Sequence, residues 1–227
     1  MTFWDSLYGA TIKDGRWKQY PRGLNLTLQI SVVAIIVGVI IGIAVAMVKV
    51  NAQGSKNPFL RFVAAICNTY TTIIRGTPLM IQLLIIYGFA WVPNGLIAAF
   101  IGFGLNSGAY MSETFRSGIQ SVDSGQLEAA RSLGLTRWQA MKSVVLPQAV
   151  KNMLPAIFNE FIVLIKETSV AGYIAVNELT KMANGIRSRT YDSISLYIAA
   201  MLYLILTFLL TLVLKSLERR FGKSDRR

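Results

Sequence analysis

The sequence contains no histidine and a single cysteine, Cys67. These absences exclude imidazole catalysis, histidine metal ligands, an internal disulfide and a cysteine cage for zinc or an iron–sulfur cluster. The chain also lacks the G-x-x-x-x-G-K-[ST] pattern, whose glycine-rich backbone cradles nucleotide phosphates. The chain therefore cannot cradle ATP phosphates in a P-loop by itself. We expect no catalytic, metal or cofactor site in it.

Charged residues are scarce as well. They make up 15% of the 227 residues, while hydrophobic residues make up 53%, whereas a soluble domain has about 25% charged residues. This composition predicts a polytopic membrane protein. The net charge of +12 is then a matter of where Lys and Arg flank the membrane spans, and it requires no nucleic-acid partner.

Long uncharged runs mark the membrane-spanning segments. Leu24–Val48 and Ser193–Leu214 contain no charged residue, and each is long enough to cross a bilayer core of about 30 Å as a helix. The uncharged run between Arg75 and Glu113 would extend about 55 Å as one helix, so we place a turn in it at Trp91–Gly95. The predicted all-α domain, residues 1–227, has five spans, at residues 22–49, 58–90, 95–117, 147–166 and 192–215.

Pro78 lies inside the second predicted span and is expected to kink it. The distribution of Lys and Arg favours an N-terminus outside and a C-terminus in the cytoplasm. In this orientation, the basic tail from Lys215 to Arg227 contacts anionic lipid headgroups on the cytoplasmic side.

Residues 118–146 form a cytoplasmic loop in this topology. Three local signals can be read from it: capping-box spacing in Asp123 with Gln126, the same spacing in Thr136 with Gln139, and a helix-ending glycine, Gly134. They predict two short helices, at about 124–133 and 137–146, with Pro147 at the next boundary. Helices this short need packing partners. The loop is either a docking surface for another protein or a loop folded onto its own spans.

The same loop carries a long gapped motif. Glu128-Ala129-Ala130 is followed by Gly134 after three residues and then by Val144-Val145-Leu146-Pro147. This pattern resembles the EAA motif of the inner-membrane permease subunits of ABC importers, with Val144 in place of the usual Ile. Further stretches resemble the polar amino acid branch of that family: Arg75–Leu79, Gly108–Glu113, Asn159–Ile162 and Lys166–Ser169. The likeness extends over residues 20–218.

The resemblance implies a type I ABC importer permease in the bacterial plasma membrane. In that family, two permease subunits form the pore, two separate ATPase subunits bind ATP and Mg on the cytoplasmic face, and an extracellular or periplasmic binding protein delivers the solute. The loop helices insert into the ATPases as coupling helices. The matching positions here are Glu128, Ala129, Ala130, Arg131, Gly134 and Leu135. Whether the second permease is an identical copy or a paralogue is left open.

Polar residues at mid-bilayer depth are functional candidates because burial in lipid costs them several kcal/mol. Span midpoints place the following in one layer: Arg75, Thr77, Asn106, Ser107, Asn159 and Glu160. We expect this layer to bind an amino acid, and the Glu160 carboxylate favours a cationic one such as arginine, lysine or histidine. Glutamine or another polar amino acid stays open. In a structural alternative, Glu160 pairs with Arg75, or Arg75 satisfies carbonyls freed by Pro78.

Two local expectations complete the interpretation. Glu113 and Arg116 are three residues apart and are expected to pair on one helix. A short helix is expected at about 177–183, outside the membrane, where it caps the pore or receives the binding protein. The competing function is an ion-coupled secondary transporter, which would contain inverted repeats and needs no docking loop.

Overall fold

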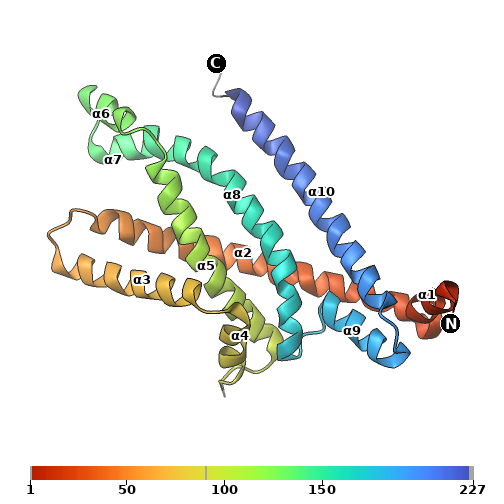
Figure 1. Ribbon diagram of the computed structural model, residues 1–227. Coiled ribbons are helices and arrows are strands. Elements are labelled where there is room, and N and C mark those ends of the chain that lie inside the picture. Colours follow the sequence, from red (N-terminus) through yellow and green to blue (C-terminus); the bar gives the residue numbers. More distant parts are fainter. Residues whose placement is uncertain (1, 90, 225–227) are drawn as a thin grey trace.

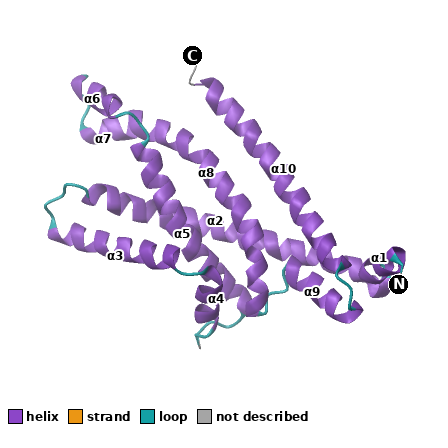
Figure 2. Ribbon diagram, in the orientation of Figure 1, coloured by secondary structure: helices purple, strands orange, loops and turns teal. Residues whose placement is uncertain are grey.

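The computed structural model describes residues 2–89 and 91–224, and all regular structure within these ranges is helical (Figures 1 and 2). Its long helices are α2 (Gln19–Ala52), α3 (Pro58–Gly76), α5 (Gly95–Gln120), α8 (Leu146–Glu167) and α10 (Ile194–Ser224). The shorter elements are α1 (Phe3–Thr11), a 3₁₀ turn η1 (Lys13–Lys18), α4 (Leu79–Tyr87), α6 (Ser124–Ser132), α7 (Arg137–Ala140), a π-helical turn η2 (Met141–Val145), a 3₁₀ segment η3 (Thr168–Ile174) and α9 (Leu179–Thr190).

The helices agree with the predicted spans in position. The first, third and fourth predicted spans lie within α2, α5 and α8, and α10 begins two residues after the expected start of the fifth, at Ile194. By length and hydropathy, Lys13–Ala52 and Ile194–Arg219 qualify as membrane spans, and α3 with α4 adds a third as a bent pair. The count of five spans stays a prediction. Ala90, the expected end of the second span, and tail residues 225–227 lie outside the described residues.

The second predicted span is two helices and not one kinked helix. The axes of α3 and α4 differ by 107° across the break at Thr77 and Pro78. Thr77 is extended, with φ −122° and ψ 146°, as expected for a residue before proline. Pro78 then begins α4 as its N-cap. Proline therefore produces the break that the sequence predicts, but as a corner instead of a kink, which corrects the expected continuous helix at 58–90.

The core of the bundle is the close crossing of α2 and α5. A Cβ atom on Gly42 of α2 would come within 2.5 Å of the Met111 Cβ on α5, and one on Gly104 of α5 would come within 2.8 Å of Val37 Cγ1. Gly38 lies directly against Ser107. The spacing Gly38-x-x-x-Gly42 thus allows the close packing, because backbones approach this closely only where side chains are absent.

The opposite end of the bundle from α6 and α7 carries α4 and α9 (Figure 1). Helix α9 begins near the predicted position but continues to Thr190, beyond the expected end at residue 183. Glu178 is its N-cap and accepts hydrogen bonds from the backbone N–H groups of Thr180 (2.7 Å) and Lys181 (2.6 Å). Burial raises the pKa of the Glu178 carboxyl, although these hydrogen bonds act in the opposite direction.

The α2–α5 crossing leads to a stability prediction. Replacing Gly42 with Val forces the two backbones apart and is expected to destabilise the fold by about 1–3 kcal/mol. Thermal unfolding of the detergent-solubilised protein measures this. The control is Gly9→Ala on α1, where an added Cβ meets nothing within 4 Å; it should leave the unfolding temperature unchanged or raise it. Equal stability of Gly42→Val and wild type would contradict the assigned role of the crossing.

Candidate functional site

Helices α6 and α7 form a compact tip between the ends of α5 and α8 (Figure 1). We call residues 124–140 the knob. The two predicted N-terminal caps, Asp123 of α6 and Thr136 of α7, are both present but differ in their hydrogen bonds. Thr136 and Gln139 form a complete capping box. The Asp123 side chain, by contrast, accepts from the backbone N–H of Gly125 at 2.8 Å and not from that of Gln126. Asp123 is therefore a simple N-cap, and the capping box predicted with Gln126 is wrong.

Gly134 ends α6 as the sequence predicts. Its φ is +87°, in the left-handed region. The N–H of Leu135 donates to the carbonyl of Ala130 at 3.3 Å, and the N–H of Gly134 donates to that of Arg131 at 3.0 Å. These two bonds constitute a Schellman motif, which requires the left-handed residue that glycine adopts without strain. The turn between α6 and α7 therefore has a defined shape.

The predicted second loop helix does not stop at Pro147. Helix α7 passes into the π-helical turn η2, which runs directly into α8 at Leu146. Pro147 lies in the first turn of α8, directly after η2, and lacks the N–H that would continue the backbone hydrogen bonds of this run of helix. The expected boundary is therefore a local change of helix type, which connects the knob to α8 without a hinge loop.

The outer surface of the knob is open. Glu128, Ala129 and Arg131 are exposed, whereas Ala130 is buried and Leu135 is half-buried. Leu133, next to Gly134, has 84% of its surface exposed. A leucine this exposed at the end of a rigid turn lacks a covering element within the described residues, which is what a docking surface requires.

A polar network fills the corner between α3 and α4. Gln82 is buried, and its Nε2 donates to the carbonyls of Ile74 (2.7 Å) and Thr77 (3.0 Å) and to Thr77 Oγ1 (2.9 Å). Asn106 Nδ2 on α5 donates to Gln82 Oε1 at 3.4 Å. The structure thus joins two predicted layer residues, Thr77 and Asn106, through Gln82. Sequence reasoning missed Gln82, although it is the one polar residue of α4 before Tyr87.

The other four predicted layer residues lie apart from this network. Ser107 is fully buried against Gly38. Arg75 is exposed, with its guanidinium 5.3 Å from the centre of the Tyr110 ring, a cation–π contact. Asn159 is exposed and Glu160 is half-buried, both on α8. No ion pair joins Arg75 to Glu160 in the described part of the chain.

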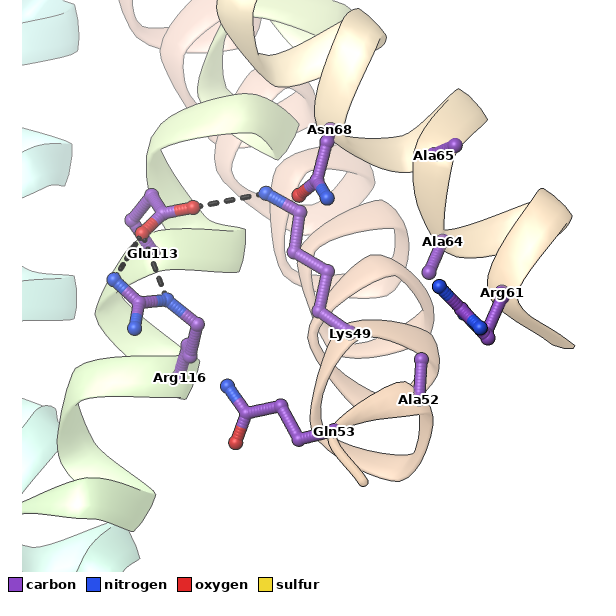
Figure 3. A pocket seen from close by; sticks show the side chains of 9 residues that line it. All are labelled: Lys49, Ala52, Gln53, Arg61, Ala64, Ala65, Asn68, Glu113 and Arg116. Carbon is purple, nitrogen blue, oxygen red and sulfur yellow. Dashed lines mark hydrogen bonds and ion pairs between the residues drawn. The ribbon is translucent and has the colours of Figure 1, made fainter. Parts of the chain in front are cut away.

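A second polar cluster lies near the knob end and was not predicted as a unit. Lys49 on α2 is buried; its Nζ donates to Thr71 Oγ1 on α3 at 2.8 Å and to Glu113 Oε1 on α5 at 2.9 Å (Figure 3). Glu113 also accepts from Arg116 Nη2 at 2.8 Å, which confirms the expected intrahelical pair. One ammonium group therefore ties three helices together. The sequence shows Lys49 only as the charge that closes an uncharged run.

This cluster borders a pocket of about 460 Å³. Figure 3 shows Arg61 and Asn68 of α3 facing Lys49 and Arg116 across it. Lys49 and Arg116 share the single carboxylate of Glu113, so both cations have an ion-pair partner while the trio keeps a net charge of +1. We interpret the cluster as a structural clamp between α2, α3 and α5.

Comparison with known proteins identifies the family to which the chain belongs. The family model described as "Binding-protein-dependent transport system inner membrane component" matches residues 38–223. The chain belongs to this family. The expected resemblance to permease subunits of ABC importers is thereby confirmed, and the chain is a transport component and not an enzyme.

Individual relatives of this permease are similar over nearly their whole length. A protein of Rickettsia felis, named as a permease of a glutamine transport system, is 41% identical over 89% of this chain and 95% of its own. The arginine transport system permease protein of Bacillus subtilis is 39% identical over 90% of this chain and 93% of its own. The crystal structure of an amino acid ABC transporter with histidines has a TM-score of 0.82 at 38% identity, covering 89% of this chain and 94% of that one. The fold is that of type I ABC importer permeases.

The Lys49 clamp yields a prediction for the permease. Lys49→Met removes both hydrogen bonds of the ammonium and is expected to lower stability by about 1.5–3 kcal/mol, the range for hydrogen bonds to charged groups. Thermal unfolding in detergent measures the loss. Lys56→Met, at an exposed lysine between α2 and α3, is the matched control and should be neutral. If both variants unfold at the wild-type temperature, the clamp does not stabilise the fold.

Proposed function

We propose that this permease is the transmembrane subunit of an ATP-driven amino acid importer and that it translocates its solute by alternating access. The observation that carries this proposal is the knob: a rigid, exposed tip built around Gly134 at the position of the EAA motif. The chain lacks a P-loop, so the energy must reach it through a surface that a separate ATPase grips. The knob has the shape and exposure for that contact.

Within the knob, the six motif residues divide into two groups. Glu128, Ala129 and Arg131 are exposed and would contact the ATPase, with the small Ala129 allowing a close approach. Ala130, Gly134 and Leu135 form the Schellman turn and set its shape. Because η2 continues into α8 without a loop, movement of the knob would be transmitted to a membrane-spanning helix. Two ATPase subunits, one per permease, fit this arrangement.

The polar layer supports a solute path along the outside of this subunit. Arg75 and Asn159 are exposed and Glu160 is half-buried, at depths where polar groups avoid lipid. They would therefore face water or a second permease subunit, identical or paralogous, that completes the path. Thr77 and Asn106 would border this path through Gln82, whereas Ser107 supports it from within by packing on Gly38.

Helices α5 and α8 run antiparallel, and their contacts set the level of Glu160. Asn152 of α8 is hydrogen-bonded to Ser121 of α5 at 3.0 Å. Counting eight residues from this pair along each helix brings Glu160 to about the level of Glu113, roughly one helical turn from Tyr110. The Tyr110 ring lies under Arg75. Glu160 and Arg75 would thus approach the same solute, the carboxylate binding its side chain cation. This favours arginine, lysine or histidine, although relatives are named for both glutamine and arginine.

The proposal includes an orientation. The knob lies in the cytoplasm with the C-terminus, and the N-terminus, α1 and α9 lie outside, facing a substrate-binding protein. Each of the five predicted spans would then cross the plasma membrane, with α3 and α4 together forming the second.

The coupling role is tested at Gly134. Gly134→Val forces a β-branched residue into a left-handed conformation at a cost of about 1–2 kcal/mol and is expected to abolish ATPase binding and uptake while membrane insertion is retained. Pull-down of the co-expressed ATPase and uptake assays measure this. The matched control is Gly15→Val, which has the same kind of backbone, φ +64°, at the other end of the molecule. It should leave ATPase binding intact.

Two outcomes would contradict the coupling proposal. Gly134→Val that binds ATPase normally would show that the turn does not shape the contact. Uptake without any ATPase partner would instead support an ion-coupled secondary transporter.

The solute assignment is tested at Glu160. Glu160→Gln removes the charge but keeps the size, and we expect transport of cationic amino acids to fall about tenfold relative to glutamine, the effect of losing one charge-assisted hydrogen bond. Competition assays against a panel of amino acids measure the ratio. Glu167→Gln, at another half-buried acid of α8, is the control. An unchanged ratio in Glu160→Gln would exclude a role of Glu160 in solute selection and leave the coupling role untouched.

A further inference from the structure

Two adjoining cavities separate the end of α2 from α7. The outer one has a volume of about 500 Å³ and the inner one about 340 Å³. They share four lining residues, Val50, Asn51, Trp138 and Met141, and so form one continuous groove. None of the residues of the Lys49 clamp or of the polar layer lines this groove.

The groove changes character along its length. Its inner part is almost entirely apolar, and its lining includes Ile43, Met47, Phe115, Ile119, Leu146 and Val150. Ile43 and Met47 belong to the uncharged run of α2, so this part lies at the depth of the hydrocarbon core. The outer part is polar, and Asn51, Gln53, Ser55 and Arg137 contribute to its lining. The transition occurs one turn beyond the last uncharged stretch of α2.

The groove is open to its surroundings. Met47 has 51% of its surface exposed and Trp138 has 69%, so large apolar side chains face outward along its edge. Arg137 is exposed, and none of the described residues forms a hydrogen bond or ion pair with its guanidinium. An unpaired guanidinium next to a tryptophan, at the end of an apolar channel, is the arrangement that binds an anionic headgroup at a membrane surface.

We propose that this groove binds one phospholipid with an anionic headgroup. An acyl chain occupies the apolar inner part, the phosphate contacts Arg137, and the Trp138 ring lies at the boundary between the two. A free phosphate would match Arg137 but leave the apolar part empty, and a purely apolar segment of a second copy would leave Arg137 unpaired. The phospholipid satisfies both ends. It also connects α2 to α7, so the lipid contributes to the stiffness of the knob's base, which goes beyond the proposed transport function.

The test uses Trp138 as the reporter. Trp4, Trp17 and Trp91 are replaced with Phe, and the single-tryptophan permease is reconstituted in phosphatidylcholine bilayers. A small fraction of brominated phosphatidylglycerol or, separately, of brominated phosphatidylcholine is then added, since bromine quenches tryptophan on contact. We expect the anionic lipid to quench Trp138 at about fivefold lower mole fraction, the effect of roughly 1 kcal/mol for one Arg–phosphate attraction. Unbrominated phosphatidylglycerol should reverse the quenching.

Two variants locate the headgroup contact. Arg137→Gln is expected to abolish the preference for phosphatidylglycerol while general quenching remains. Lys142→Gln, at an exposed lysine outside the groove, is the matched control and should keep the preference. Equal quenching by the two lipids in the wild type, or an equal effect of both variants, would overturn the assignment of the headgroup to Arg137. Absence of quenching by either lipid would overturn lipid occupancy of the groove altogether.

Discussion

The close approach of α2 and α5 is the constraint on which the other contacts depend. Glycines on both helices remove the side chains that would hold them apart, and the remaining atoms meet at van der Waals distance. Only with the helices this close does the Lys49 ammonium reach Glu113 across the interface. The same crossing buries Phe103 and Ile30 in the main core cluster, together with Leu83 of α4. Loss of the small residues would therefore disturb the clamp and the α3–α4 corner together.

The sequence predicted local structure correctly where the two interacting residues are close together along the chain. The capping box at Thr136, the left-handed Gly134 and the Glu113–Arg116 pair each depend on residues within six positions of one another, and each is present. Relations over longer distances were missed. From the sequence alone, Lys49 is only a charge at the end of a membrane span. Its hydrogen bonds to Thr71 and Glu113 form only after three helices have packed together.

The corner between α3 and α4 shows the same limit. Pro78 predicts a break, but the angle depends on what the following helix packs against, and Leu83 lies on Gly102 of α5 with its Cδ2 only 2.5 Å from where a Cβ would be. Gln82 stabilises this corner within the membrane, because its side chain donates hydrogen bonds to the carbonyls left free at the end of α3. A single glutamine in an apolar stretch carries no periodic signal, so its role was visible only in the structure.

The polar residues of the predicted layer fall into two groups. Some find hydrogen-bond partners within this subunit, and others point to its surface without such partners among the described residues. Thr77 and Asn106 are each hydrogen-bonded to Gln82, which the sequence did not predict, and the three residues form a wall of satisfied polar groups. Arg75 and Asn159 are exposed and Glu160 is half-buried, and their polarity is costly in lipid unless water, solute or a second subunit reaches them. The knob lies at one end of α8 and Glu160 lies past its middle, with Pro155 between them. Because a proline inside a helix removes a backbone hydrogen bond, α8 is most easily bent at Pro155, between the knob and Glu160. In the proposed mechanism, a displacement of the knob would therefore change the position of Glu160 without disturbing the wall formed by α4 and α5.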